Sequence, residues 1–325
     1  MDFLYLVAQL RNPVCDFIFE TITHLGEETF FLVLAIVFYW CINKREGYYI
    51  LFTGLFGTII NQAAKITFRI DRPWVKDPGF QPVGDSKIEA TGYSFPSGHT
   101  QNVATTWGSI AAYNKKNRVI SWISIAIIVL VSFSRLYLGV HTLLDVSVSL
   151  VISLILVLCM RPLFATEEKF NKSFPYVVAV AIFMALAFLA YVLAIGNDPT
   201  LDAENYHSAL KNASTMVGCI TGLGLVFIVD TKWTNFETDG KWYAQVIKAA
   251  VGFGIVLAIK SGLSAPLTSL FGNEFVARAV RYFLIVAFAG AVWPLTFKWF
   301  ANLKIAALDK FTDKVRGIFS KAEKN

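Results

Sequence analysis

Long apolar runs, separated by short polar segments, make up most of the 325-residue chain. A transmembrane helix needs about 20 predominantly apolar residues, and most of these runs approach that length. Because a spanning segment must satisfy its backbone hydrogen bonds within the lipid, the runs predict an all-α fold, a polytopic bundle of transmembrane helices. We expect nine spans, at residues 28–43, 48–68, 98–113, 119–136, 141–160, 175–195, 211–229, 245–262 and 278–299.

The two ends of the chain have a different pattern. In residues 1–27, Phe17, Ile18 and Ile22 recur at helical spacing among polar residues, which predicts amphipathic helices lying on the membrane surface. Residues 301–325 predict a basic cytoplasmic tail that lies on an anionic leaflet. The lysines of this tail are Lys304, Lys310, Lys314, Lys321 and Lys324.

The composition is that of a membrane protein. Hydrophobic residues make up 55% of the chain and charged residues only 16%, which argues against a soluble protein. The formal net charge is +6, but no basic stripe is interleaved with aromatic residues, so we expect no nucleic-acid partner. The basic residues concentrate instead in loops on one side of the predicted bundle.

Three clusters of charged and histidine residues interrupt the apolar pattern between residues 65 and 145. A charged residue inside a membrane segment costs roughly 2.5–3.5 kcal/mol, so such clusters point to a functional site. The second and fourth spans end on the side of the membrane where the third and fifth begin, so the clusters converge. The three clusters have the sequences Lys65-Ile-Thr-Phe-Arg-Ile-Asp-Arg72-Pro73, Pro96-Ser97-Gly98-His99 and Ser134-Arg135-Leu-Tyr-Leu-Gly-Val-His141-Thr-Leu-Leu-Asp145.

The basic residues of these clusters suit a phosphoryl group. Lys65, Arg72 and Arg135 are cations that can stabilise the charge spread over the phosphoryl oxygens in the transition state. If the helix continues from Lys65, Arg72 lies about two turns further on nearly the same face, and Pro73 ends the helix. The Pro96–His99 cluster reads as a turn that opens a helix, and the N-terminus of a helix is an anion-binding site.

The third cluster supplies a nucleophile. His141 and Asp145 are four residues apart, so on a helix they share a face. A carboxylate that holds one imidazole nitrogen leaves the other nitrogen free to attack.

The pattern K-x6-RP, PSGH and SR-x5-H-x3-D resembles the type 2 phosphatidic acid phosphatase (PAP2) family, which includes glucose-6-phosphatase and is related to vanadium haloperoxidases. The resemblance covers roughly residues 25–165. It implies that His141 forms a phosphohistidine, that Asp145 orients the imidazole, and that His99 protonates the leaving oxygen and then activates water. It implies that the phosphoryl oxygens are held by Lys65, Arg72, Arg135, Ser97 and the Gly98 backbone N–H.

The implied activity is hydrolysis of a lipid phosphate or diphosphate within the membrane. Phosphatidate, phosphatidylglycerol phosphate, undecaprenyl diphosphate and a sphingoid base phosphate are candidate substrates. The implied mechanism needs no cofactor and no metal, and no carboxylate cluster suited to Mg²⁺ stands near the motifs. Two alternatives stay open: a lipid phosphotransferase that uses the same site, and a phospholipid transporter or binding protein. The intact nucleophile, acid and orienting aspartate disfavour the latter.

On these grounds the chain divides into an interfacial segment (1–27), a PAP2-like catalytic transmembrane core (28–195), additional transmembrane helices (196–300) and the basic tail (301–325). The last three spans exceed the usual six-helix core. Three roles are open for these spans: they line a lipid access path, they form the surface of a homo-oligomer, or they have a function unrelated to the site. Within them, Gly218 and Gly222 are four residues apart, which predicts close helix packing.

The polar loop at residues 74–95 lies between two of the motifs. We expect its aromatic residues either to meet a lipid tail over the site or to form an interface belt. These aromatics are Trp74, Phe80, Tyr93 and Phe95.

Four other polar residues suggest no catalytic role. We expect Arg69 to be an interfacial charge next to the site and His24 to be an interfacial histidine. His207 reads as a solvated loop residue, and Lys260 as a side chain that reaches from a span end to the membrane surface.

The distribution of basic residues predicts the orientation. Loops on the side away from the motifs, together with the tail, hold the larger share of the 29 Lys and Arg. Because basic loops concentrate in the cytoplasm, we expect a cytoplasmic C-terminus and an active site on the extracytoplasmic side of a bacterial cytoplasmic membrane.

Overall fold

The computed structural model of the chain describes residues 1–310 and residue 312. Every regular element in this part of the chain is a helix and none is a strand, which confirms the all-α prediction. Of the predicted basic tail, Lys314, Lys321 and Lys324 lie outside the described residues.

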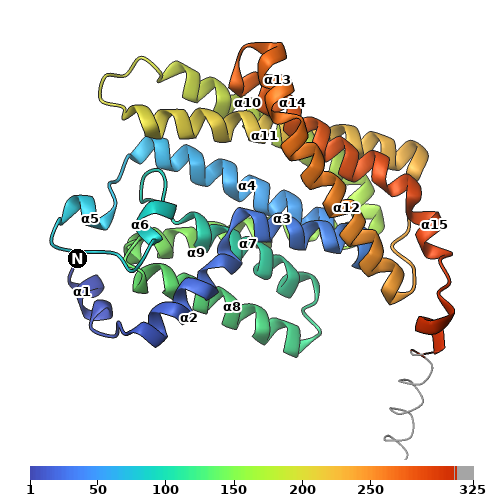
Figure 1. Cartoon of the computed structure of the whole chain (residues 1–325), viewed down its shortest axis with the longest axis horizontal. Helices are drawn as coiled ribbons and strands as arrows, with labels where there is room; N and C mark the ends of the chain where they lie inside the picture. The colour runs from blue at the N-terminus through green and yellow to red at the C-terminus, as the bar shows by residue number, and fades with distance from the viewer. Residues whose placement is uncertain (311, 313–325) are drawn as a thin grey trace, which may run out of the picture.

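Helix α4 (Lys44–Phe68) runs through the middle of the bundle and is buried along most of its length (Figure 1). It packs against α3, α7, α9, α10 and α11. The helices of the N-terminal two thirds are α1 (Asp2–Ala8), α2 (Pro13–Thr23), η1 (His24–Gly26), α3 (Glu28–Val37), η2 (Phe38–Ile42), α4, α5 (Pro73–Lys76), α6 (Ser86–Glu89), α7 (Gly98–Tyr113), α8 (Arg118–Tyr137), α9 (Leu143–Met160), η3 (Arg161–Phe164) and α10 (Glu167–Ala194).

The C-terminal helices cover the side of α4 that faces away from α7 to α9 (Figure 1). Helices α11 and α14 form the most extensive pair in the structure, and α11 also packs on α4 and α10. These elements are α11 (Ala203–Val229), η4 (Asp230–Thr234), α12 (Trp242–Gly262), α13 (Ser264–Phe271), α14 (Glu274–Ala287), η5 (Phe288–Val292), η6 (Trp293–Thr296) and α15 (Phe297–Ala301).

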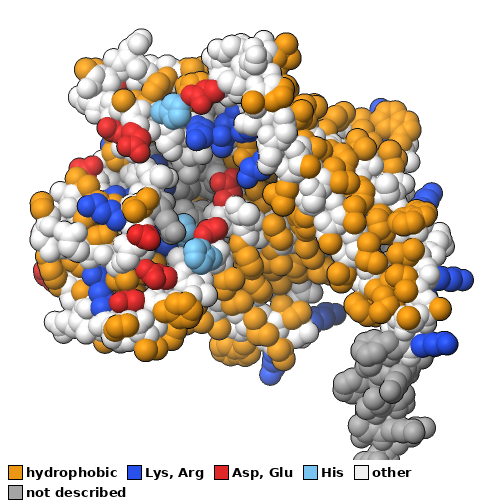
Figure 2. Space-filling view, in the orientation of Figure 1, with side chains coloured by type: hydrophobic (Ala, Val, Ile, Leu, Met, Phe, Trp, Pro, Cys, Tyr) orange, Lys and Arg blue, Asp and Glu red, His pale blue; other side chains and the backbone are white. Residues whose placement is uncertain are grey.

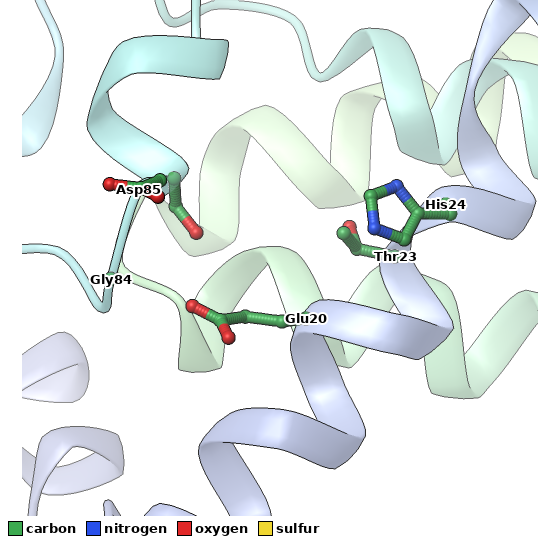
Figure 3. Close-up of a pocket in the computed structure, with 6 residues that line it drawn as sticks. Glu20, Thr23, His24, Gly84 and Asp85 are labelled. Carbon is green, nitrogen blue, oxygen red and sulfur yellow. The ribbon is translucent and has the colours of Figure 1, made fainter.

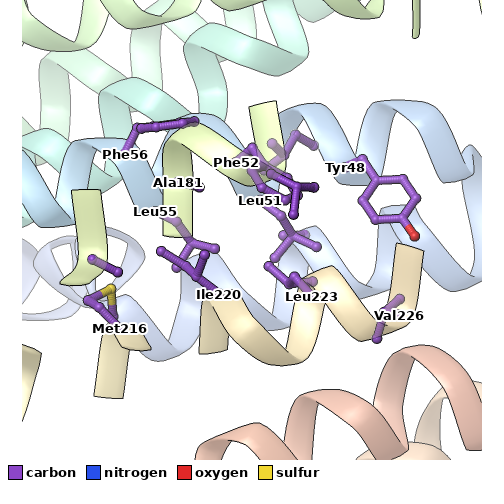
Figure 4. Packing of buried hydrophobic residues seen from close by; sticks show 14 of the residues in the cluster. Tyr48, Leu51, Phe52, Leu55, Phe56, Ala181, Met216, Ile220, Leu223 and Val226 are labelled. Atoms are coloured by element: carbon purple, nitrogen blue, oxygen red, sulfur yellow. The ribbon is translucent and has the colours of Figure 1, made fainter. Parts of the chain in front are cut away.

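Apolar side chains from α4, α10 and α11 meet in one continuous core (Figure 4). The Phe174 ring lies 5.0 Å from that of Phe52 and 4.7 Å from that of Phe227, so α10 connects the other two helices. Between membrane helices such contacts are stabilised by close van der Waals packing, because lipid tails are as apolar as these side chains. The C-terminal helices therefore share one core with the N-terminal helices.

Six helices in the described part of the chain are long and apolar enough to cross a membrane, and a bent pair, Pro13–Gly26 with Glu28–Ile42, brings the number to seven. The two further predicted spans correspond to α4 and α7, which do not meet that standard. Helix α7 has only 16 residues, and α4 carries polar residues such as Asn61 on a buried face. A helix that contacts protein on most sides does not need a lipid-like composition.

The bent pair turns by 54° next to Glu27. It joins residues that we assigned to a surface segment with residues that we assigned to the first span. The position of residues 1–27 on the membrane surface stays a prediction.

The condition that the helix continues from Lys65 through Arg72 is not met, so these two side chains do not share a helix face. Helix α4 ends at Phe68, and Arg69 follows in the left-handed region with a φ of 49°. The backbone of Arg72 is extended, as the residue before a proline prefers, and Pro73 opens the short helix α5 instead of ending α4.

The close packing predicted at Gly218 and Gly222 is confirmed. A Cβ atom at Gly218 would overlap the carbonyl oxygen of Ala279 in α14. A Cβ atom at Gly222 would lie 2.9 Å from Cβ of Val286 in the same helix. Two glycines one turn apart on α11 thus let the α14 backbone approach.

Candidate active site

The three sequence clusters meet at one end of the bundle. The Ser97 N–H, before α7, donates to the carbonyl of Asp145 in α9 at 3.2 Å. Arg72, after α4, donates through Nη1 to the carbonyl of Val140, after α8, at 2.9 Å. Their predicted convergence is therefore observed.

His141 lies in the loop between α8 and α9 and is almost fully buried. Its Nδ1 is 3.5 Å from Oδ2 of Asp145. The pair does not lie along one helix face, as the spacing suggested, because α9 begins only at Leu143. Asp145 instead points back past the start of the helix, where Thr142 and Asp145 cap each other reciprocally.

Two donors hold the Asp145 carboxylate in this direction. Its Oδ2 accepts the hydroxyl proton of Ser94 at 2.6 Å and the backbone N–H of Thr142 at 2.7 Å. A carboxylate near a helix N-terminus is also stabilised by the helix dipole. Asp145 therefore faces Nδ1 of His141 as a fixed, charged acceptor.

The other ring nitrogen of His141 faces a cation. Arg72 Nη1 lies 3.1 Å from Nε2, and a guanidinium can only donate, so Nε2 presents its lone pair and the ring proton belongs on Nδ1. Burial lowers the pKa of His141 well below its usual range, and the Arg72 charge acts in the same direction. The imidazole is thus neutral, as a nucleophile requires.

Arg72 is held by carbonyl groups of the loop before α7. Its Nε and Nη2 donate to Gly92 and Thr91 at 3.0 and 2.7 Å. Burial lowers the pKa of Arg72 to about 10, an effect that Asp145 opposes, so the group is charged at neutral pH. Lys65 Nζ donates to the next carbonyls of the same loop, those of Tyr93 and Ser94.

The third cation, Arg135, is buried at the end of α8. Its Nη1 donates to the hydroxyl of Thr23 at the end of α2, so the N-terminal segment contributes a side chain that supports the site.

Helix α7 opens into the same site. Ser97 is its N-cap and accepts the Thr100 N–H at 3.4 Å, and the Ser97 carbonyl accepts the Ser149 hydroxyl at 2.9 Å. The N–H groups of the first turn, at Gly98 and His99, have no partner within the helix and favour an anion. The site thus combines three cations, a helix N-terminus, two histidines and one oriented carboxylate.

Two family models match the chain. The model described as PAP2 superfamily covers residues 46–169, and the one described as PAP2 superfamily phosphatase, transmembrane extension, covers residues 214–306. This chain belongs to the PAP2 superfamily. It is an integral membrane phosphatase. The residues that match the transmembrane extension model form helices α11 through α15.

Curated relatives of this PAP2 protein come from Bacillus subtilis (strain 168). Phosphatidylglycerophosphatase B is 29% identical over 148 residues, which cover 42% of this chain and 69% of the relative. Undecaprenyl-diphosphatase BcrC is 30% identical over 149 residues, which cover 45% of this chain and 73% of the relative. The crystal structure of a PAP2 type phosphatidylglycerolphosphate phosphatase from Bacillus subtilis matches with a TM-score of 0.42 at 27% identity, covering 50% of this chain and 82% of that one.

A cavity of about 330 Å³ lies beside the Arg135 end of this PAP2 site (Figure 3). Thr23, which accepts from Arg135, is one of its walls, and Glu20 and Asp85 face it from α2 and the loop before α6. Its acidic walls suit hydroxyl groups better than a second phosphate. His24 also lines this cavity, and its Nδ1 lies 2.5 Å from Oε1 of Glu27. The sequence did not indicate that His24 would line a cavity.

Two of the four aromatic residues of the loop at residues 74–95 contradict both expectations. Phe80 and Tyr93 are buried within the protein, so they meet neither lipid nor the interface. Trp74 lies under the Arg72 guanidinium, with 5.8 Å between its ring and Cζ, and Phe95 packs on Phe68. Trp74 and Phe95 are half-buried, and for these two side chains contact with a lipid tail or with the membrane interface stays a prediction.

Arg69 lies next to this loop but does not enter the PAP2 site. It forms an ion pair of 2.7 Å with Asp198 in the segment before α11 and donates to Thr200. Hydrogen bonds from Thr200 and Arg69 lower the pKa of Asp198 to about 2. Among the residues that the structure describes, no group of three or more His, Cys, Asp or Glu is arranged to hold a metal ion.

Several supporting residues were not found from the sequence. Ser94, Thr23 and Ser149 are single hydroxyl residues with no spacing signal. Thr142 could have been found, because Thr142 and Asp145 have the spacing of a helix capping box.

Proposed function

We propose that this PAP2 protein hydrolyses a lipid phosphate or diphosphate through a phosphohistidine on His141. The observation that supports it most is the position of the imidazole, with Nδ1 3.5 Å from Asp145 and Nε2 3.1 Å from Arg72. A neutral imidazole whose free nitrogen faces a phosphate-binding cation is suited to attack phosphorus.

In the first step, Nε2 of His141 forms a bond to phosphorus while the bond between phosphorus and the leaving oxygen breaks. His99 gives that oxygen its proton and the lipid alcohol, or lipid monophosphate, departs. Asp145 stabilises the positive charge that develops on the imidazole. Lys65, Arg72 and Arg135 with the Gly98 N–H stabilise the phosphoryl oxygens.

In the second step, His99 removes a proton from water, and the water oxygen attacks the phosphohistidine. The bond between phosphorus and Nε2 breaks, inorganic phosphate leaves, and His141 returns to its neutral form. Phosphate monoesters are among the slowest compounds to hydrolyse unaided, so such a site must lower the barrier by about 20 kcal/mol or more. In this proposal, preorganised cations and a covalent intermediate lower the barrier by this amount without a metal ion.

The names of the relatives support a lipid substrate. One relative is a phosphatidylglycerophosphatase and another is an undecaprenyl-diphosphatase. We therefore include both a phosphate monoester and a diphosphate among the candidate substrates of this protein. A lipid phosphotransferase would use the same first step and transfer the phosphoryl group to a lipid hydroxyl instead of water. We propose that the site faces the extracytoplasmic side, because the basic residues Lys44, Lys115 and Lys116 lie at the other end of α4 and α7.

The experiment measures phosphate release by the purified protein in detergent with EDTA present. Substrates are phosphatidate, phosphatidylglycerol phosphate, undecaprenyl diphosphate and sphingosine 1-phosphate, with glucose 6-phosphate as a soluble comparison. The protein should release phosphate from at least one lipid, His141→Ala should abolish release, and Asp145→Asn should lower it strongly. His207→Ala is the matched control, because His207 is exposed and paired with Glu274.

Three outcomes would contradict the proposal. Wild-type release by a folded His141→Ala variant would exclude the assigned nucleophile. A strict requirement for Mg²⁺ would exclude the metal-free scheme. Transfer of ³²P to an added lipid alcohol, without inorganic phosphate, would identify the phosphotransferase.

A further inference from the structure

The C-terminal helices carry basic side chains of their own on the side of the membrane where the site lies. Arg278 and Arg281 are one turn apart on α14, and Lys260 is near the end of α12. None of them belongs to the three catalytic clusters. Cations in membrane helices are costly and point to a function. Figure 2 shows charged and histidine side chains gathered around a hollow below α13 and α14, whereas hydrophobic side chains cover the part of this face over α12.

The two arginines are held in position by neutral groups. Arg278 Nε donates to the hydroxyl of Thr215 in α11 at 2.7 Å, and Arg281 Nη1 donates to the hydroxyl of Ser264 in α13. Both guanidinium groups lie against the ring of Tyr282, at 5.3 and 5.6 Å. Three helices therefore orient two adjacent cations around one aromatic ring.

The charge of these cations is not neutralised by an ion pair. Within residues 1–310 and 312, no carboxylate lies within 4.0 Å of a charged nitrogen of Arg278, Arg281 or Lys260. Glu28 interacts electrostatically with Arg278 and Lys260 without reaching that distance. Glu274, one turn before Arg278, is paired with His207 at 2.7 Å.

One donor of this group has no acceptor. In the described part of the chain, Nε of Arg281 is buried and makes no hydrogen bond. A buried, unpaired charged donor costs free energy, which an anion at this position would recover.

Two connections place these arginines beside the catalytic site. Asn212, one turn before Thr215 on α11, donates to Gln62 at 3.0 Å, and Gln62 is one turn before Lys65 on α4. The second connection runs through Glu28, which interacts electrostatically with Arg278. Glu28 is two residues after Gly26, and Gly26 packs against His99: a Cβ atom added at Gly26 would lie 3.0 Å from Cβ of His99.

We propose that Arg278 and Arg281, with Lys260 nearby, form a second anion-binding site for the phosphodiester group of an anionic lipid. Guanidinium groups match phosphate oxygens with paired donors, and the neutral partners leave donors for this purpose. The phosphodiester belongs either to a substrate that also carries a terminal phosphate or to a neighbouring bilayer lipid. The substrate version rests on the proposed phosphatase function, whereas binding by itself does not.

The binding experiment uses the His141→Ala protein, so it does not depend on turnover. The purified protein is exposed to equal amounts of dioleoyl phosphatidylglycerol and dioleoyl phosphatidylcholine, and the lipids that it retains are measured by native mass spectrometry. We expect preferential retention of phosphatidylglycerol and a roughly tenfold loss of that preference when Arg278→Gln and Arg281→Gln are added. Arg278→Lys with Arg281→Lys should keep most of it.

The matched control is Arg118→Gln with Lys298→Gln, which removes two exposed cations at the other end of the helices. It should keep the preference. If the Arg278→Gln/Arg281→Gln protein is folded, as judged by its melting temperature, and keeps the same preference, the site is refuted. Equal loss in the control would show a general charge effect and would also refute it.

Turnover then separates the two sources of the phosphodiester. If it belongs to the substrate, Arg278→Gln/Arg281→Gln should raise KM about tenfold for phosphatidylglycerol phosphate but not for phosphatidate, which has no phosphodiester. If it belongs to a bilayer lipid, the variant should lose stimulation by added phosphatidylglycerol with both substrates. Absence of turnover in the wild type would count against the phosphatase and leave the binding result standing.

Discussion

Ser94 donates its hydroxyl proton to Oδ2 of Asp145 at 2.6 Å, and both residues are almost fully buried. The same oxygen faces Nδ1 of His141. Ser94 therefore helps to fix the direction from which the carboxylate meets the imidazole, although it stands outside the three sequence clusters.

We predict that Ser94→Ala lowers kcat by about tenfold. A hydrogen bond to a charged group contributes about 1.5–3 kcal/mol, and 1.4 kcal/mol corresponds to a factor of ten in rate. Because the Ser94 hydroxyl proton is donated to Asp145, KM should change little. Steady-state kinetics on the best lipid substrate measure both constants.

Ser121→Ala is the control for Ser94→Ala, since Ser121 bonds only to a backbone carbonyl at the exposed start of α8. An unchanged kcat in Ser94→Ala would mean that the Thr142 N–H alone holds Asp145. A higher KM without a change in kcat would place Ser94 in substrate binding instead.

The sequence predicted the helical class and the convergence of the clusters, because both follow from apolar run lengths and from which span ends carry charge. It did not predict how the residues meet. His141 and Asp145 were paired by helical spacing, yet they meet across the start of α9, where Thr142 caps the helix. Arg72 was placed on a continuing helix, yet the left-handed residue Arg69 ends α4 and turns the chain. These details depend on caps and backbone turns that apolar periodicity does not encode.

The same limit applies to residues that support the site from distant parts of the chain. Thr23 is separated from Arg135 by more than a hundred residues, and its position depends on how α2 packs against α8. A single threonine in an amphipathic segment has no signal for such a contact. The Gly218 and Gly222 pair was predicted correctly because small residues one turn apart are a local pattern.

We predict that Thr23→Val weakens substrate binding without unfolding the protein. Valine keeps the shape of threonine but removes the oxygen that accepts from Arg135 Nη1. The loss of this acceptor should lower kcat/KM by roughly tenfold, in line with about 1–2 kcal/mol for one such bond. Competition by inorganic phosphate should weaken in parallel.

Thr21→Val controls for the change from threonine to valine on the same helix. Thr21 is exposed and its hydroxyl bonds only to the Phe17 carbonyl. If Thr23→Val keeps full activity and phosphate affinity, then the contact with Thr23 does not position Arg135.

A buried lysine joins the C-terminal helices to the first ones. Lys248 of α12 donates through Nζ to the carbonyl of Trp40 at 2.7 Å, and Nζ lies 4.1 Å from the centre of the Phe297 ring. Trp40 belongs to the π-helical turn η2. We predict that Lys248→Met lowers stability by about 1–3 kcal/mol, because the buried carbonyl loses its partner. The melting temperature in detergent should fall by several degrees, whereas exposed Lys172→Met should leave it unchanged.

The packing of α11 on α14 gives the last prediction. Any side chain at Gly218 would meet the carbonyl of Ala279, so Gly218→Val must move α14 away from α11 or distort one of them. Overpacking of this kind costs about 1–3 kcal/mol. Since Thr215, one turn earlier on α11, holds Arg278, the displacement should also disturb the arginine pair. We expect a lower melting temperature together with loss of phosphatidylglycerol retention. Gly254→Val provides the control, because a Cβ there meets nothing within 4 Å. A Gly218→Val protein that melts and binds lipid like the wild type would show that α11 and α14 do not need this close approach.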